Sequence, residues 1–368
     1  MLRVGAIPDI EDLEDDETPE EDLWFLPGPD PEEDVPPGAA PDRRGQDRAL
    51  FDPEPWQAAQ ADLARELAEV AGLFGALDQR LRTAPAGWRQ RLALREVSDL
   101  SWWTGDRLGP ERIGLWVTLR AGSTRDTERA LARAGWAMRR LAPGSGPAPA
   151  PSEDLAVFLD RLPGPAARGR TGGAPAPAPD RAVEDALADL AEVMAGEQAL
   201  HPITAAARLF HAWRALGPAG SVDLEAAVLA ARHAAAMSRA PGQGAIFLPL
   251  AQTGAGALRG QGDPHAKLSA WLRGAERATL AALLHLDRVA AWRQNAEAVI
   301  ADFSGRTPPA LIALLGAWPQ VSAPMAGAET GASRAAVQRN LDRLVQRGLI
   351  REITGQERFR VWAARLVG

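Results

Sequence analysis

The longest helical pattern in the chain, in residues 264–303, limits the fold more than any other feature. After Pro264 this segment contains no proline, and its apolar side chains recur at spacings of three and four residues. At a rise of about 1.5 Å per residue, one helix of this length spans most of a domain. Its apolar positions are Leu268, Trp271, Leu272, Leu280, Leu283, Leu284, Leu286, Val289 and Trp292. We therefore expect a helical body built around one long helix.

Shorter helical patterns flank this segment. Trp56 opens an apolar stripe that continues to Leu81, and similar stripes recur on both sides of residue 180. The run at 115–119 would also suit a strand by residue type, but no partner strand lies nearby, so we assign it to a helix. We expect helices over residues 56–81, 88–100, 113–119, 124–141, 154–162, 180–195, 202–216, 222–238 and 248–259.

Composition divides the chain into five parts. Residues 1–50 are rich in Asp, Glu, Pro and Gly, which disfavours a packed core, and residues 163–179 alternate Ala with Pro as a linker does. We predict a disordered acidic leader at 1–50, an N-terminal helical domain at 51–162, an Ala/Pro linker at 163–179, a central helical domain with the long helix at 180–306, and a C-terminal module at 307–368.

The leader carries most of the negative charge. Residues 1–47 hold 16 acidic and 3 basic side chains, whereas the remainder holds 38 basic and 32 acidic ones. The leader's net charge of -13 therefore adjoins a body of +6. Trp24 and Phe25 form an apolar island that would suit a groove of a partner protein, although a solvated tail with one apolar spot is the simpler interpretation.

Composition also excludes several classes of function. The chain has no cysteine, which rules out disulfides, thiolate catalysis and Cys-ligated metal centres. It has no run of 18 apolar residues, so a membrane span is not expected, and its first residues do not form a signal peptide. The bias toward Ala, Arg, Gly and Pro is typical of a high-GC genome. We expect a bacterial cytoplasmic protein.

Residues 307–368 have the order of a winged helix-turn-helix. Pro308 and Pro309 begin a first helix, and Ser322 with Pro324 begins a short second one. Ser333 caps a third helix over residues 334–346, which Gly348 closes. The remaining residues favour a hairpin with a glycine-containing turn. The fold class is therefore all-α, with a multi-helix body, a C-terminal winged helix-turn-helix and a disordered acidic N-terminal leader.

The third helix has one apolar and one polar face. Val337, Leu341 and Leu344 share the side expected to be buried, while Ala335, Gln338, Arg339 and Asp342 lie opposite. Gln pairs with adenine and Arg with guanine in a major groove. In the hairpin, Arg358 and Arg360 alternate with Phe359 and Val361, which places both cations toward phosphate and both apolar side chains inward. The candidate DNA-binding residues are Ser333, Arg334, Gln338, Arg339, Gln356, Arg358 and Arg360.

Several segments carry a family resemblance. The C-terminal end of an uncharacterised alphaproteobacterial family is similar to the sequence from Thr330 to Leu341 followed by Arg347–Gly355 and Arg358–Trp362, and the preceding Arg306–Leu311 and Val321–Ala326 fit its pattern as well. Members of that family are often plasmid-borne and have a helical domain of unknown function before a helix-turn-helix. The resemblance implies a DNA-binding regulator or replicon-associated factor, with no established reaction.

No constellation of catalytic residues stands out. His201-Pro202 resembles the beginning of the Fic motif of adenylylating enzymes, but the Gly-Asn-Gly-Arg that cradles phosphates is missing, so the body would at most be an inactive relative. The five histidines lack metal-ligand spacing. We expect no enzyme activity, cofactor or metal.

The expected function is therefore binding of double-stranded DNA, as a transcriptional regulator or replicon-associated factor. The helical body would serve for homodimerisation or partner contact. The alternative is a non-enzymatic interaction subunit of a larger complex, whose winged helix and acidic leader dock onto partner proteins.

Overall fold

The computed structural model describes residues 48–119, 125–145, 153–161, 181–217, 222–239, 241–355 and 359–366. Over these residues the fold is an all-α body followed by a winged helix-turn-helix, as predicted. Residues 1–47 and the predicted linker at 163–179 lie outside the described residues. The leader was predicted to extend to residue 50, but Arg48–Phe51 forms helix α2 and Leu50 is buried in the body.

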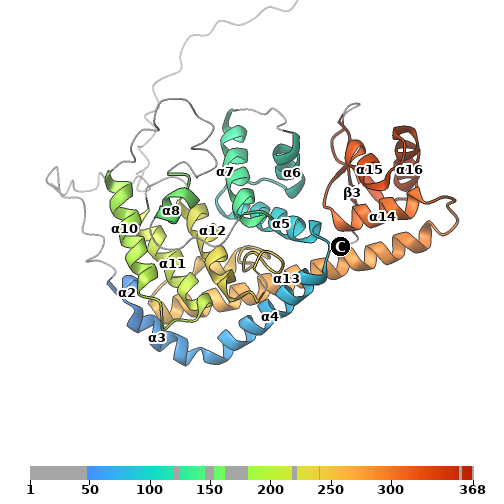
Figure 1. The fold of residues 1–368 in the computed structure, drawn as a ribbon. Coiled ribbons are helices and arrows are strands. Elements are labelled where there is room, and N and C mark those ends of the chain that lie inside the picture. The colour runs from blue at the N-terminus through green and yellow to red at the C-terminus, as the bar shows by residue number, and fades with distance from the viewer. Residues whose placement is uncertain are drawn as a thin grey trace, which may run out of the picture. The chain divides into compact units, whose positions relative to one another are not determined.

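The body is formed by helices in the order shown in Figure 1. Its N-terminal part contains α3 (Pro53–Asp62), α4 (Ala64–Thr83), α5 (Gly87–Trp103), α6 (Pro110–Leu119), α7 (Arg125–Leu141) and α8 (Glu153–Phe158). Its second part contains α10 (Arg181–Ala195), α11 (Pro202–Leu216), α12 (Val222–Ala234), two 3-10 turns (Ala235–Met237 and Gly256–Arg259) and α13 (Pro264–Val299). The segment at 115–119 is helical, as predicted.

Three of these helices begin in the same way, with a capping side chain followed by proline. Asp52 Oδ1 accepts from the Glu54 backbone N–H at 3.0 Å, and Asp263 Oδ1 accepts from that of Ala266 at 2.8 Å. His201 Nδ1 accepts from the Ile203 N–H at 3.2 Å. Each cap satisfies a donor that the first turn leaves unpaired, and the following proline has none to lose. The His201-Pro202 pair therefore has a structural use as a helix start.

The predicted division of the body into two domains is not how the described residues pack. One hydrophobic cluster extends from Leu50 to Leu286, and it combines residues of α4 and α5 with residues of α11, α12 and α13. Helix α13 packs along both α3 and α4, far from it in sequence. Trp271 of α13 lies 5.4 Å from the ring of Phe210 of α11. The two predicted domains share one core, because residues 51–162 and residues 180–306 each cover only part of the apolar face of α13.

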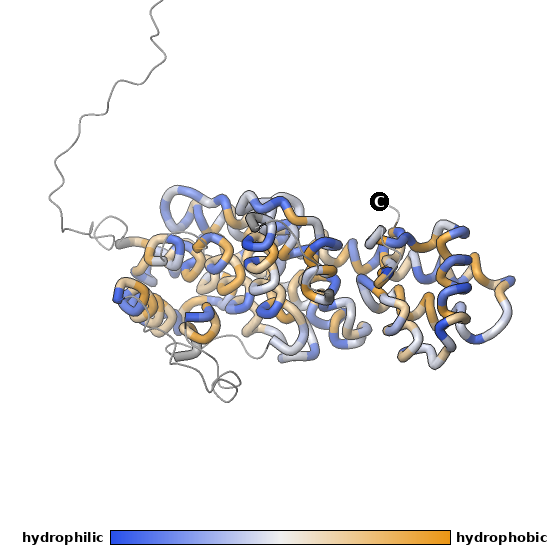
Figure 2. The backbone as a smooth tube through the Cα atoms, turned by 90° about the horizontal axis from the view of Figure 1, so that it is seen from above, coloured by the Kyte–Doolittle hydropathy of each residue, from blue (hydrophilic) through white to orange (hydrophobic). Residues whose placement is uncertain are grey.

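The apolar positions alternate with polar ones along the helices, as the colouring of Figure 2 shows.

The predicted helix at 248–259 is wrong. Only Gly256–Arg259 forms a 3-10 turn, and Thr253, Gly254 and Ala255 all adopt positive φ values, which no right-handed helix allows. The backbone here is held from outside the segment. The N–H groups of Leu250 and Ala251 both donate to Glu96 Oε1 of α5, each at 2.8 Å.

The winged helix-turn-helix contains α14 (Thr307–Ala317), β1 (Val321–Ser322), α15 (Ala323–Thr330), α16 (Arg334–Gln346), β2 (Ile350–Glu352) and β3 (Val361–Ala364). Its three strands form an antiparallel sheet with β3 in the centre. Trp362 faces both Val321 and Glu352 in register.

The core of this module begins earlier than the predicted boundary at residue 307. Trp292, Ala296 and Ile300 from the end of α13 belong to the same hydrophobic cluster as Leu311 and Leu341. The Trp292 indole N–H donates to the Leu349 carbonyl at 2.9 Å. Helix α13 is therefore part of two cores, one in the body and one in the winged helix.

The carboxyl of Glu96 is fully buried, and burial raises its pKa to about 7 despite the two backbone N–H groups that it accepts from. A carboxyl whose folded pKa exceeds its unfolded value binds more protons in the folded state between the two values. Its contribution to stability is complete below pH 4.5 and is lost as the pH rises through 7.

We predict that Glu96→Gln removes this loss. The Gln carbonyl can still accept from Leu250 and Ala251 but does not ionise. The free energy of unfolding of the variant relative to the parent should therefore rise between pH 5 and pH 8, by on the order of 2 kcal/mol. Urea denaturation of both proteins across this range measures the difference between their free energies of unfolding. The opposite pH dependence of the buried histidines is the same in both proteins and cancels in this difference. A difference that stays constant with pH would contradict the prediction.

Candidate nucleic-acid interface

The two caps that separate the helices of the winged helix-turn-helix are present as the sequence predicted. Ser322 Oγ accepts from the Met325 N–H at 3.4 Å, and Ser333 Oγ accepts from the Ala336 N–H at 3.3 Å. Between them Gly331 adopts a φ of +63° and ends α15. This left-handed residue makes the tight turn after which α16 starts in a new direction.

Helix α16 buries the face that the sequence indicated. Val337, Leu341 and Leu344 are all fully buried against α14 and α15. On its N-terminal half, Ser333, Arg334, Ala335 and Arg339 are exposed. Among the described residues, neither arginine has an ion-pair partner. This half of α16 thus offers two uncompensated cations around one small residue.

Gln338, predicted to contact bases, is partly exposed and already ordered. Its amide Nε2 donates to Asp342 Oδ1, one turn further along α16, at 2.9 Å. The Gln338 side-chain oxygen and its second N–H remain available, which are the groups that would pair with an adenine edge. The spacing of four residues between Gln338 and Asp342 was visible in the sequence, but their bond was not predicted.

The arginines on the C-terminal half of α16 are occupied by other groups. Arg343 stacks over the ring of Phe303 at 3.8 Å, and Arg347 lies 5.0 Å from the same ring. Arg347 also pairs with Asp302 at 2.8 Å, and this bond lowers the pKa of the Asp302 carboxyl. Both arginines therefore attach the end of α16 to the segment between α13 and α14, and the surface suited to DNA lies at the other end.

The hairpin differs from the predicted arrangement in two respects. Arg360 donates from Nε to Glu352 Oε2 at 2.9 Å and lies 3.8 Å from Asp342 Oδ1, so its charge is compensated. Phe359, predicted to point inward, is 75% exposed. Its positive φ of 57° interrupts the alternation of the strand, and β3 starts only at the buried Val361. Gln356 and Arg358 lie outside the described residues.

Arg360 positions the wing relative to α16. Its guanidinium lies 5.0 Å above the Trp362 ring and connects Glu352 of β2 with Asp342 of α16. Because Asp342 also holds Gln338, a continuous set of polar contacts extends from the sheet to the predicted base-reading side chain. The phosphate contact of Arg360 stays a prediction. Its two carboxylate partners were not predicted, because the alternation of a strand gives the face of a side chain and not its neighbours.

The winged helix is fixed to the body by hydrogen bonds to its backbone. Arg91 of α5 donates from Nη2 to the carbonyls of Leu315 at 3.1 Å and Trp318 at 2.7 Å. The Trp88 indole donates to Gly316 at 3.0 Å. The approach is so close that a Cβ at Gly87 would lie 2.4 Å from the Ala317 carbonyl oxygen. The C-terminal end of α14 is thus bound to α5.

Comparison with known proteins supports the assignment of this module. Residues 308–364 match the protein family described as "HTH DNA binding domain". No curated protein matches the chain. The matched residues include α14, α15, α16 and all three strands. The protein is therefore a DNA-binding protein of the helix-turn-helix class. Within the described residues no helix is long and apolar enough to cross a membrane.

We predict that the N-terminal half of α16 reads base sequence. Gln338→Ala and Arg339→Ala should each weaken binding to a preferred duplex by about 1–3 kcal/mol and relax the preference at one position, because each removes a hydrogen-bonding group from the major groove. Gln346→Ala, at the exposed C-terminal end of the same helix, is the matched control and should bind as the parent does. Fluorescence anisotropy on selected and scrambled duplexes measures both effects. Unchanged affinity of both the Gln338→Ala and the Arg339→Ala variants would show that another face of the protein contacts DNA.

Proposed function

We propose that the protein is a non-enzymatic, sequence-reading DNA-binding regulator, acting in transcription or in the maintenance of a replicon. The observation that carries the proposal is the contrast along α16. Arg334 and Arg339 at its N-terminal half are exposed and have no ion-pair partner among the described residues, whereas Arg343 and Arg347 are bound to Phe303 and Asp302. Recognition helices of this class insert their N-terminal residues into the major groove.

The non-enzymatic part of the proposal is supported by the structural use of the histidines. His201 caps α11, and His233 pairs with Glu197 at 3.1 Å. His211 is buried between Trp56 and Phe210, and burial lowers its pKa to about 3, far from the range of a general base at neutral pH. These side chains are committed to packing and capping.

The body is proposed to join copies of the protein or to contact partners. Trp102, at the end of α5, is 58% exposed, and Leu284 of α13 is 57% exposed. Large apolar side chains at the surface are typical of contact sites when they gather in patches, but single ones are ordinary. The second candidate, a subunit whose winged helix docks onto proteins, is favoured by Phe359, an apolar side chain of the winged helix that is 75% exposed.

Selection of bound fragments from a genomic pool tests the proposed function. The full chain should enrich a small set of fragments that share one motif, and the Arg334→Ala, Arg339→Ala double variant should lose that enrichment. Point variants are preferable to deletion of residues 307–368, because deletion would expose Trp292, Ala296 and Ile300 on α13. Enrichment without a shared motif, or equal enrichment by the double variant, would favour the docking subunit.

A further prediction concerns the acidic leader. Residues 1–47 carry a net charge of -13 and are tethered to the same chain as the winged helix, whose residues 307–368 carry +4. A tethered polyanion has an effective concentration in the millimolar range and should compete with DNA phosphates, most strongly at low salt. A chain starting at Arg48, which keeps Leu50 in the core, should bind random duplex more tightly than the full chain, and the difference should close as salt rises.

The control for this prediction keeps the leader's charge. The Trp24→Ala, Phe25→Ala double variant should bind random duplex as the full chain does, because competition depends on charge alone. Affinity at several salt concentrations, measured by anisotropy, distinguishes the cases. Equal affinity of the shortened and full chains at low salt would refute the competition and leave partner docking as the use of the leader.

A further inference from the structure

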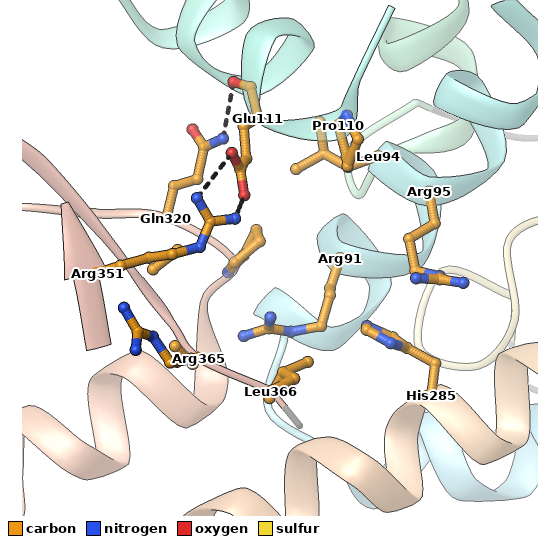
Figure 3. Close-up of a pocket in the computed structure, with 13 residues that line it drawn as sticks. Arg91, Leu94, Arg95, Pro110, Glu111, His285, Gln320, Arg351, Arg365 and Leu366 are labelled. Atoms are coloured by element: carbon orange, nitrogen blue, oxygen red, sulfur yellow. Dashed lines mark hydrogen bonds and ion pairs between the residues drawn. The ribbon is translucent and has the colours of Figure 1, made fainter. Parts of the chain in front are cut away.

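A cavity of about 270 Å³ lies where the body meets the winged helix. Helices α5, α6 and α13 line one side of it, and the segment before β1, strands β2 and β3 and the residues after β3 line the other. Figure 3 shows Arg91, Arg95 and His285 extending from the body and Arg351 extending from the winged helix to Glu111, while the Arg365 guanidinium points away from Arg91. The DNA-binding surface of α16 does not line this cavity.

The charge of the cavity is strongly positive. Four of its lining residues are arginines, and among the described residues Glu111 is the only carboxylate that lines it. The two terminal nitrogens of the Arg351 guanidinium donate to Glu111, Nη1 to Oε2 at 3.1 Å and Nη2 to Oε1, so this acid compensates only one of the four cations. The remaining three arginines come from two different parts of the fold and line the same cavity.

Arg95 and Arg365 have no ion-pair partner among the described residues. Arg95 is four residues after Arg91 on α5, which places both on one face of the helix. Burial raises the pKa of the Asp99 carboxyl, and the charge of Arg95 offsets part of that rise from a distance. The two side chains form no ion pair in the part of the chain that the structure describes. The Arg95 Nε is buried and has no hydrogen-bond partner.

Arg91 is buried on the floor of the cavity. Arg91 is 6% exposed. Its Nη2 donates to two backbone carbonyls, and its buried Nε has no hydrogen-bond partner among the described residues. Burial lowers the pKa of this guanidinium to about 10, so it remains charged at neutral pH. A buried cation that has neutral acceptors and no counter-ion is costly unless another anion supplies the charge.

His285 of α13 adds a neutral hydrogen-bonding group to the same wall. It is 7% exposed, and its Nε2 is buried with no hydrogen-bond partner among the described residues. Burial, together with the charges of Arg95, Arg91 and Arg288, lowers its pKa to about 3, so the ring is neutral. A neutral imidazole with a free nitrogen can donate to an anion without adding charge.

We propose that this cavity binds a small anionic ligand, either a dicarboxylate or a phosphate, and that the ligand bridges Arg91 and Arg95 of the body and Arg365 of the winged helix. The cavity is slightly below the range of about 300–1,000 Å³ of pockets for drug-sized ligands, which indicates a compact molecule. Guanidinium groups bind carboxylate and phosphate through paired N–H donors.

Such a ligand would strengthen the attachment of the winged helix to the body. Without an anion, the arginines of the two sides repel one another across the cavity. An anion between them attracts the arginines of both sides. The contact between the winged helix and the body is then stabilised by the free energy of ligand binding. Binding of the ligand does not depend on the proposed function, whereas an effect on DNA affinity rests on it.

Calorimetric titration of the full chain tests the proposal with two probes, inorganic phosphate and succinate, at constant ionic strength set with sodium chloride. We expect one saturable site for at least one probe and a rise in Tm with that probe. Arg95→Gln and Arg365→Gln should each weaken the site at least tenfold. Arg129→Gln, an exposed arginine on α7 that does not line the cavity, is the matched control and should leave the site unchanged.

The outcomes separate the ligand classes and the two proposals. Saturation by phosphate alone indicates a phosphorylated ligand, and saturation by succinate alone indicates a dicarboxylate. Absence of saturable binding of both probes to a folded parent protein, or equal binding by the Arg95→Gln and Arg365→Gln variants, would overturn the proposal. Saturable binding by a protein that enriches no DNA motif would leave the cavity in place and contradict only the proposed function.

Discussion

The hydrogen bond from Trp292 to the Leu349 carbonyl joins the long helix to the winged helix, and the rest of the arrangement depends on that junction. Helix α13 contributes Trp271 to the body core and Trp292, Ala296 and Ile300 to the second core. At about 1.5 Å per residue a helix of 36 residues is about 54 Å long, so one rigid element carries both. The DNA-binding module is therefore an extension of the body's central helix, and its position is set by packing as well as by hydrogen bonds.

Arginine carries out three different tasks in this chain, and position decides which. Arg91 and Arg347 hold backbone or side-chain acceptors and fix one element to another. Arg360 connects the wing to α16 through two carboxylates. Arg334 and Arg339 have no such partner among the described residues and remain available to phosphate or bases. In a composition with 41 basic residues, nearly all of them arginine, only this comparison of partners separates the binding cations from the structural ones.

The sequence predicted those features that depend on local pattern. The period of the apolar residues located most helices. Ser322, Ser333 and Gly348 located helix ends in the DNA-binding module, because caps and left-handed glycines act within a few residues. Features that depend on distant residues were missed. Residues 248–255 are shaped by Glu96, and the shared core requires knowing that α13 covers α4. The exposure of Phe359 was missed for a local reason, because its positive φ interrupts the alternation of the strand. The arginines of the cavity come from residues 91 to 365 and share no motif.

The cavity and the DNA-binding surface are connected by one short strand. Adjacent residues of a strand point to opposite faces. In β2, Arg351 faces the body and pairs with Glu111, whereas Glu352 faces the other way and holds Arg360, which in turn lies beside Asp342 of α16. Any displacement of β2 that changes the Arg351 pair must also move Glu352, because the two share a peptide bond. Asp342 holds the Gln338 amide, so the contacts leading from the cavity end at a predicted base-reading side chain. A ligand that displaced Arg351 from Glu111 would therefore also act on the contacts that hold the Gln338 side chain.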